Sequence, residues 1–243
     1  MKKCIGNLVV DIGNSSIKIG LFKRATLLKD FVFEQDEDAL RFINDQGQVR
    51  IIISSVKKEV LEFSKKIKHR NPIILEAQTP IPFLNHYNTK DTLGLDRIAA
   101  VAGAQALMNN SNKLIIDIGT CITYDFIDRS NQYKGGGISP GVVLRFKAMN
   151  SYTSKLPSVE TFEASPLIGN STKEALVSGV INGITAELEG IIDQYRTLFP
   201  DLKVFVCGGG LNCFESKLKT TIFAAPKLVL IGLNRILEYN EES

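Results

Sequence analysis

The chain has 243 residues, of which 44% are hydrophobic and 23% are charged, so we expect a globular protein with room for two small domains or one large one. The net charge of +3 is too small to indicate a nucleic-acid or membrane partner, and no apolar run approaches the roughly 20 residues of a membrane helix. Two histidines argue against a His-rich metal site, and four cysteines without CxxC spacing or an export signal predict reduced thiols in a cytoplasmic protein.

Hydrophobic runs and helical spacing predict a mixed sheet with helices packed on it in the first half of the chain. The expected strands are 7–12, 17–22, 30–34, 49–56 and 71–77, and the expected helices are 36–45, 58–68 and 92–110. Residues 78–93 contain Pro80, Pro82 and several polar residues, which indicates either an active-site or connecting loop or an inert linker.

The second half repeats this order of elements. The expected strands are 113–118, 121–128, 132–138, 202–207 and 222–224, and the expected helices are 142–150, 171–199 and 228–239. In helix 171–199, Ser171 and Glu174 have the spacing of a capping box, and an apolar face runs down to Leu198. We therefore expect a fold-level duplication with an N-terminal half at 1–110 and a C-terminal half at 111–243.

Each half begins with a buried strand that ends in Asp-Ile-Gly, at 11–13 and again at 117–119. Glycine after a strand lets backbone N–H groups approach a ligand, and the small polar residues that follow add donors. An Asp at the strand end can accept a cation, so the pattern suits a polyphosphate. One copy could be a simple tight turn, but two copies in corresponding places favour a nucleotide site.

Walker-type GxxxxGK[ST], Rossmann GxGxxG, HExxH and GxSxG motifs are absent from the sequence. The two Asp-x-Gly hairpins, with the triple glycine at 208–210, resemble the superfamily of sugar kinases, actin and chaperone ATPases. That resemblance implies an α/β fold: a duplicated two-domain actin-like (ribonuclease H-like) ATPase fold, with mixed sheets flanked by helices and a nucleotide clamped by the two hairpins.

Further motifs narrow the resemblance to one family. They are DIGNS at 11–15, GLDR at 94–97, DIGT at 117–120, GGGISPG at 135–141, KLP at 155–157, GNST at 169–172 and GVINGITAELEGI at 179–191. In this order they resemble the type III pantothenate kinases over nearly the whole chain. The resemblance implies ATP-dependent phosphorylation of pantothenate to 4'-phosphopantothenate, the first step of coenzyme A biosynthesis. One departure is Ser15-Ser16, where the family most often has Thr-Asn.

The resemblance also implies roles for individual residues. The phosphates of ATP would be bound by Asp11, Ile12, Gly13, Asn14, Ser15, Ser16, Ile17, Lys18, Gly119 and Thr120. Pantothenate would be bound by Tyr87, Gly94, Leu95, Asp96, Arg97 and Thr172. Asp11 is the candidate to hold Mg²⁺ through water, unless it only caps its turn, and Asp117 would bind a monovalent cation, K⁺ or NH₄⁺. Residues 208–210 either border adenosine or form a plain strand-to-helix turn.

Asp96 is the candidate general base for the pantothenate hydroxyl. It falls in the first turn of the expected helix 92–110, where the helix dipole favours a carboxylate by about 0.3–1 kcal/mol. An ordinary helix N-terminal acid would look the same without the GLDR match. Arg97 could bind an anionic group of the substrate in a forked geometry, or could form a surface salt bridge.

Helix 171–199 contains Gly179, Gly183 and Gly190, and each costs roughly 1 kcal/mol relative to Ala. Such glycines are tolerated where another backbone comes close, either the chain's own sheet or a second subunit. The family forms two-fold dimers, so the resemblance implies a homodimer in which Thr172 reaches the partner's substrate. Two other functions stay open: another small-molecule kinase of the same scaffold, or a non-catalytic nucleotide-binding regulator.

Overall fold

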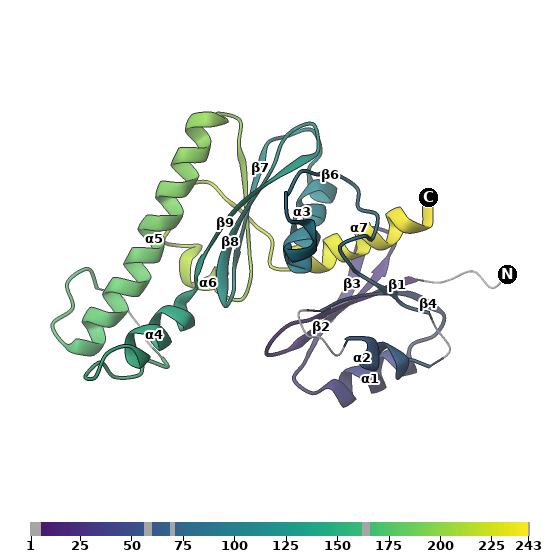
Figure 1. Cartoon of the computed structure of the whole chain (residues 1–243), viewed down its shortest axis with the longest axis horizontal. Helices are drawn as coiled ribbons and strands as arrows, with labels where there is room; N and C mark the ends of the chain where they lie inside the picture. Colours follow the sequence, from purple (N-terminus) through teal and green to yellow (C-terminus); the bar gives the residue numbers. More distant parts are fainter. Residues whose placement is uncertain (1–5, 56–59, 69–70, 162–165, 243) are drawn as a thin grey trace. The chain divides into compact units, whose positions relative to one another are not determined.

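The computed structural model describes residues 6–55, 60–68, 71–161 and 166–242 (Figure 1). Residue 56 of the expected strand 49–56, residues 58–59 of the expected helix 58–68 and residues 69–70 lie outside the described residues. Two compact units are present: unit 1 comprises 1–110, 129–134 and 227–243, and unit 2 comprises 111–128 and 135–226. This division differs from the expected halves, because two segments of the second half belong to unit 1.

Unit 1 is built on a five-stranded sheet in the order β3-β2-β1-β4-β5. Its strands are β1 (Gly6–Ile12), β2 (Ile17–Lys23), β3 (Thr26–Phe33), β4 (Val49–Ser55) and β5 (Ile73–Ile74). β1 pairs antiparallel with β2 and parallel with β4. Ala39 and Ile43 of α1 (Asp36–Asp45) and Phe63 of α2 (Val60–Lys65) join the buried side chains of these strands in one core. The apolar spacing of the first half therefore predicts its sheet and helices well.

Two further helices, α3 (Leu95–Leu107) and α7 (Leu228–Glu242), complete unit 1. They cross at glycines: a Cβ on Gly103 would lie 2.3 Å from the carbonyl oxygen of Leu228, and one on Gly232 would lie 1.7 Å from that of Ala99. α7 also contacts the sheet, where buried Asn7 donates to the Asn234 side chain at 2.7 Å. The end of the chain is thus part of the core of the N-terminal unit.

The expected strand 71–77 is reduced to the two residues of β5, and the expected strand 30–34 already begins at Thr26. The chain leaves β5 in a turn in which Thr79 N–H donates to the Glu76 carbonyl at 3.0 Å, so pairing cannot continue. The expected loop 78–93 contains two short elements, β6 (Leu84–Asn85) and the 3₁₀ helix η1 (Lys90–Thr92).

The sheet of unit 2 has the strand order β11-β10-β7-β8-β9. Its strands are β7 (Lys113–Ile118), β8 (Cys121–Ile127), β9 (Gln132–Pro140), β10 (Lys203–Cys207) and β11 (Phe223–Ala224), and its helices are α4 (Val142–Ser151), α5 (Thr172–Leu198) and α6 (Leu211–Phe214). Two antiparallel hairpin strands follow β7, and the parallel strand β10 lies on its other side. This is the order of the unit 1 sheet, so the strand topology supports the predicted duplication.

The start of β9 explains why residues 129–134 belong to unit 1. Gln132 and Tyr133 pair in parallel with Leu84 and Asn85 of β6, and the N–H of His86 donates to the Tyr133 carbonyl at 3.1 Å. Neither β6 nor this pairing was predicted, because two-residue strands have no periodicity to detect.

Helix α5 lies alongside the sheet of unit 2, and its N-terminal part extends past the strands next to α4 (Figure 1). Ser171 caps it as predicted, accepting from the Glu174 N–H at 3.2 Å. By length and composition it could cross a membrane, but seven of its residues are buried in the unit 2 core, so we assign it as a core helix. Leu198, expected on the buried face, is 71% exposed because it ends the helix.

Candidate active site

The first hairpin joins β1 and β2 in unit 1. Asp11 is half-buried and faces Lys18 across the antiparallel pair and Ser54 across the parallel one. The turn closes with a hydrogen bond from Gly13 N–H to the Ser16 carbonyl at 3.0 Å. Asn14 and Ser15 at its tip are exposed. A carboxylate beside an exposed turn of small polar residues fits a phosphate and its metal ion.

The second hairpin joins β7 and β8 in unit 2, and two glycine segments lie against it. A Cβ on Gly208 would lie 2.3 Å from the Asp117 carboxylate, and the φ of Gly208 is +91°. Gly210 N–H donates to the Ile118 carbonyl at 2.8 Å, and Gly141 N–H donates to that of Thr120 at 3.0 Å. The structure therefore brings Asp117, Gly119 and Thr120 together with the triple glycine at 208–210 and the end of the GGGISPG motif.

Asp96 and Arg97 lie in the first turn of α3, as the sequence predicts. The half-buried Asp96 carboxylate accepts the backbone N–H of Arg97 at 2.8 Å. A Cβ on Gly94 would lie 2.5 Å from the same carboxylate, so glycine at this position leaves room for it. Arg97 is only 5% exposed, which excludes the surface salt bridge as its role.

Tyr87 brings the 78–93 segment to α3. The Arg97 guanidinium lies 5.6 Å from the centroid of the Tyr87 ring, within cation–π range. Tyr87 stacks in turn on Tyr133, with centroids 6.2 Å apart, and Phe83 meets Tyr133 edge-on at 6.0 Å. The segment thus contributes a side chain to the candidate substrate site, which argues against an inert linker.

The sequence analysis did not identify Tyr133 as a site residue, although its side chain is 1% exposed and its ring stacks on that of Tyr87. The sequence gives little indication of this role, because Tyr133 stands just before a glycine-rich motif. It also belongs to β9, whose first residues are in unit 1 and whose remaining residues are in unit 2. Thr172 is an exposed residue at the first position of α5, at the end of the helix that lies next to α4.

No group of three or more His, Cys, Asp or Glu side chains within the described ranges could hold a metal ion by itself. A divalent ion at Asp11 would therefore take most of its oxygen ligands from phosphates and water, which is how Mg²⁺ is usually bound in phosphoryl-transfer enzymes. The single carboxylate of Asp11 at the end of β1 fits this mode of binding.

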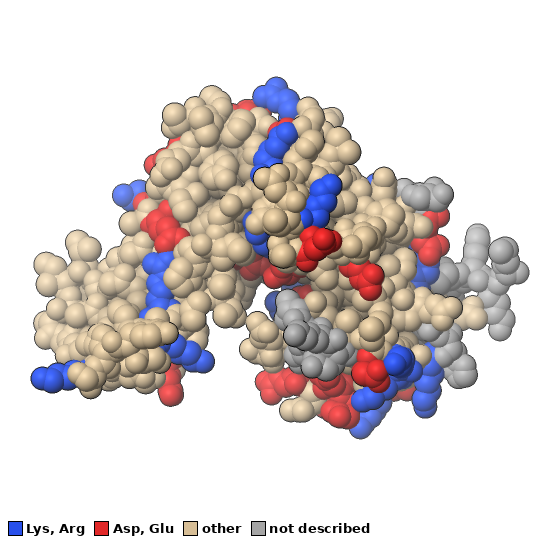
Figure 2. All heavy atoms as spheres, in the orientation of Figure 1, with Lys and Arg blue, Asp and Glu red and all other residues tan. Residues whose placement is uncertain are grey.

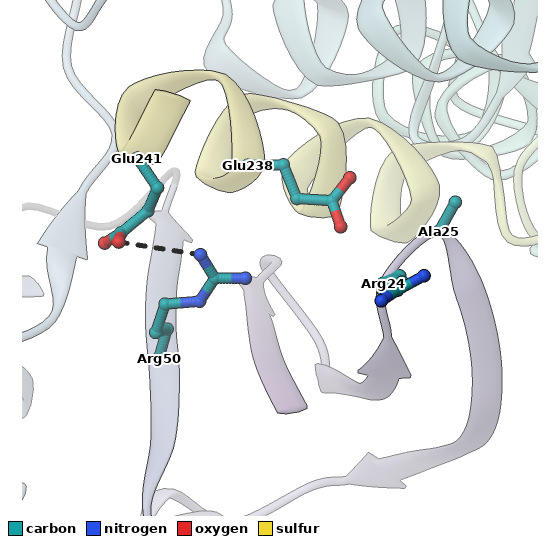
Figure 3. Close-up of a pocket in the computed structure, with 5 residues that line it drawn as sticks. All are labelled: Arg24, Ala25, Arg50, Glu238 and Glu241. Carbon is teal, nitrogen blue, oxygen red and sulfur yellow. Dashed lines mark ion pairs between the residues drawn. The ribbon is translucent and has the colours of Figure 1, made fainter. Parts of the chain in front are cut away.

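A pocket of unit 1 is lined by none of these residues. It is lined by Arg24, Ala25, Arg50, Glu238 and Glu241, where α7 covers the β2–β3 turn and β4 (Figure 3). Arg50 and Glu241 form an ion pair across it at 3.5 Å. It contains no predicted site residue, so we assign it no part in phosphoryl transfer.

Comparison with known proteins decides the family. The family model of type III pantothenate kinase matches residues 7–194. The chain belongs to the type III pantothenate kinase family. Type III pantothenate kinases from Cytophaga hutchinsonii and Phocaeicola vulgatus are 42% and 43% identical to it, over 96% and 97% of this chain and 99% of each relative.

Solved structures agree with this fold. A Campylobacter jejuni protein described as a conserved Baf family transcriptional activator superposes with a TM-score of 0.65 at 24% identity, covering 97% of this chain and 100% of its own. A glucokinase from an Antarctic psychrotroph gives a TM-score of 0.52 at 14% identity, covering 98% and 100%. The actin-like kinase fold expected for this type III pantothenate kinase family member is therefore confirmed, and membership implies a kinase that uses ATP with a divalent metal ion.

Proposed function

We propose that the chain transfers the γ-phosphoryl group of ATP to the hydroxyl group of pantothenate, forming 4'-phosphopantothenate for coenzyme A biosynthesis. The observation that carries this proposal is the GLDR turn of α3, with Asp96 beside an Arg97 that is buried against Tyr87. Relatives named type III pantothenate kinase over almost the full chain supply the substrate.

Each residue of the site has a role that its environment supports. The hairpin at 11–18 binds phosphate oxygens through its turn, and Asp11 holds Mg²⁺ through water, which neutralises the charge of the phosphates. Asp96, in the first turn of α3, accepts the proton of the attacking hydroxyl. Arg97 and Tyr87 bind pantothenate, with the cation attracting the anionic end of the substrate.

The second hairpin is proposed to hold a monovalent cation, K⁺ or NH₄⁺, at Asp117, while Gly119 and Thr120 contact ATP. One carboxylate surrounded by carbonyl oxygens suits a large, weakly hydrated cation better than a small divalent one. The close approach of Gly208 supports this proposal, because a Cβ there would lie 2.3 Å from the Asp117 carboxylate and 2.5 Å from the Ile118 carbonyl oxygen, so both oxygens lie beside the same glycine.

A homodimer is also proposed. A Cβ on Gly179, Gly183 or Gly190 would meet no atom of the described residues within 4 Å outside the backbone of α5 itself, so these glycines do not accommodate the sheet of unit 2. Apolar side chains are exposed nearby: Val143 by 60%, Tyr152 by 90% and Ile168 by 85%. Figure 2 shows mostly uncharged residues over α4 and the start of α5, with several Lys and Arg side chains among them. An apolar surface beside unpacked helical glycines fits a second copy of α5.

A coupled assay of ADP release tests the function. With MgATP and K⁺, pantothenate should stimulate ADP release, and Asp96→Asn should abolish the stimulation. Release with another alcohol but not with pantothenate would indicate a different kinase of this scaffold. ATP binding without any turnover would indicate a nucleotide-binding regulator. Either result would overturn the proposal.

A further inference from the structure

Arg145, Glu187 and Tyr124 form a polar cluster in unit 2 that no role assigned above uses. Glu187 of α5 accepts the Tyr124 hydroxyl of β8 at 2.7 Å through Oε1, and its Oε2 pairs with Arg145 of α4. Tyr124 is 2% exposed, and the Arg145 and Glu187 side chains are 22% and 24% exposed. The cluster therefore joins two helices and a strand largely out of contact with water.

The same arginine holds the end of the GGGISPG motif. Arg145 Nε donates to the Pro140 carbonyl at 2.7 Å, and its Nη2 donates to the Ser139 hydroxyl at 2.9 Å. The N–H of Arg145 donates to the Gly141 carbonyl at 3.0 Å. Since guanidinium is a rigid planar fork, these bonds fix residues 139–141 relative to Glu187.

Residues 139–141 lie directly on the second phosphate hairpin. Gly141 N–H donates to the Thr120 carbonyl at 3.0 Å, and a Cβ on Gly141 would lie 2.3 Å from the Gly119 carbonyl oxygen. On the other side of the turn, Tyr124 belongs to β8, which begins at Cys121 immediately after Thr120. The cluster thus contacts both chain segments that determine where Gly119 and Thr120 lie.

The positive charge of Arg145 is balanced by the carboxylate of Glu187. Burial pushes the pKa of Glu187 upward, but hydrogen bonds from Ser139, Arg145 and Tyr124 outweigh burial and leave the pKa below its ordinary value. Burial, together with the Glu187 bond, raises the pKa of Tyr124. Glu187 is therefore ionised and Tyr124 neutral at neutral pH, and the ion pair with Arg145 persists.

We propose that Arg145 and Glu187 are positioning residues for ATP: through residues 139–141 and Tyr124 they hold the Gly119–Thr120 turn in the orientation that contacts the nucleotide. This inference rests on the proposed function of the second hairpin. Neither residue touches substrate. Loss of either should misplace the turn and weaken nucleotide binding, because small displacements of a binding group are costly.

The test measures binding of a non-hydrolysable ATP analogue by calorimetry, and separate KM values for ATP and pantothenate. In Arg145→Ala, the Kd of the analogue and the KM for ATP should rise about tenfold, as a loss of ~1.4 kcal/mol would produce. The KM for pantothenate should change less than about twofold, the scatter expected for an independent site. Arg145→Lys keeps the charge without the fork and should restore part of the affinity.

Arg196→Ala is the matched control, because Arg196 of α5 bonds Thr220 at 2.9 Å in the same unit, away from the hairpin. It should leave the Kd and both KM values unchanged. The Arg145→Ala/Glu187→Ala double variant should be no weaker than Arg145→Ala alone, since both act on one cluster. If Arg145→Ala fails to fold, the Kd of the ATP analogue is measured instead in Arg145→Lys and Glu187→Gln, and a rise in that Kd supports the positioning role.

An unchanged Kd, or an equal rise in both KM values, would overturn the positioning role. Analogue binding is measured without pantothenate, so it remains informative even if wild-type protein shows no pantothenate-dependent ADP release. An absence of pantothenate-dependent ADP release in the wild type would refute the proposed function, but it would not refute the positioning of the hairpin by Arg145 and Glu187.

Discussion

At the scale of single residues, Asp96 is the proposed general base. Asp96→Asn is nearly isosteric and should lower kcat by about 10²–10⁴-fold, the usual cost of removing a general base. The melting temperature and ATP affinity should stay at wild-type values, as measured by calorimetry. Asp91→Asn is the control, because Asp91 is an exposed acid in η1 one turn earlier. Substantial remaining turnover in Asp96→Asn would assign the base elsewhere.

Asp117 offers a second test at this scale. Activity should be higher in K⁺ than in Na⁺ at equal ionic strength, because the site suits a large cation. In Asp117→Ala the rate should no longer respond to the exchange of K⁺ for Na⁺. Initial rates in the two salts provide the measurement. Equal wild-type rates in both salts would refute the cation site.

The charge of Glu187 should make the free energy of unfolding depend on pH. Glu187 has a pKa below its ordinary value of 4.5, so its ionised form stabilises the fold above that value. This contribution should be lost as the pH falls through the lower pKa of the folded state. Unfolding in urea across pH should show wild type more stable than Glu187→Gln at neutral pH, with the gap closing in acid. A gap that does not depend on pH would contradict the ionised carboxylate.

At the scale of elements, α5 begins at a cap. Ser171→Ala removes the side-chain acceptor for the Glu174 N–H and should lower the free energy of unfolding by about 1 kcal/mol. Ser216→Ala, at an exposed position in the same unit, should have no comparable effect. Denaturant unfolding of both variants gives the comparison, and equal stabilities would mean that the cap contributes nothing.

Long periodic elements could be predicted from the sequence, and short ones could not. α1 and β7 match their expected bounds because their apolar spacing is clear. β6 depends on pairing with a distant strand, and β5 pairs with β4 over only two residues before the chain turns, so neither has a local signal. The helical spacing correctly predicted that Asp96 and Arg97 lie in the first turn of α3, but stacking of Tyr87 on Tyr133 depends on tertiary contacts that spacing does not reveal.

At the scale of the whole molecule, the proposed dimer can be separated from folding. Gly183→Leu should leave the subunit folded, because a Cβ at this position meets no described residue outside its own helix, and the helix gains about 1 kcal/mol over glycine. Sedimentation should nevertheless show monomers where wild type is dimeric. Gly47→Leu, also in open space, is the control. A dimeric Gly183→Leu protein would remove α5 from the interface.

Complementation gives a second measurement of the dimer. Mixing inactive Asp96→Asn with an inactive Thr172→Arg subunit should partly restore ADP release, since one site of each mixed dimer would contain both residues intact. No recovery in a mixture shown to exchange subunits would mean that Thr172 does not serve the partner's site.

The placement of α7 in unit 1 has a consequence for biosynthesis. Leu228 packs on Gly103, and Asn234 bonds Asn7, so the N-terminal unit contains residues that the ribosome adds after residues 111–226 of unit 2. Domains commonly fold in order as they emerge during translation. Here unit 1 lacks α7 until residues 228–242 have been synthesised. By then residues 111–226, which include all of unit 2, have already been synthesised. The packing of α7 on α3 and on the sheet of unit 1 can therefore form only after residues 111–226 of unit 2 have been synthesised.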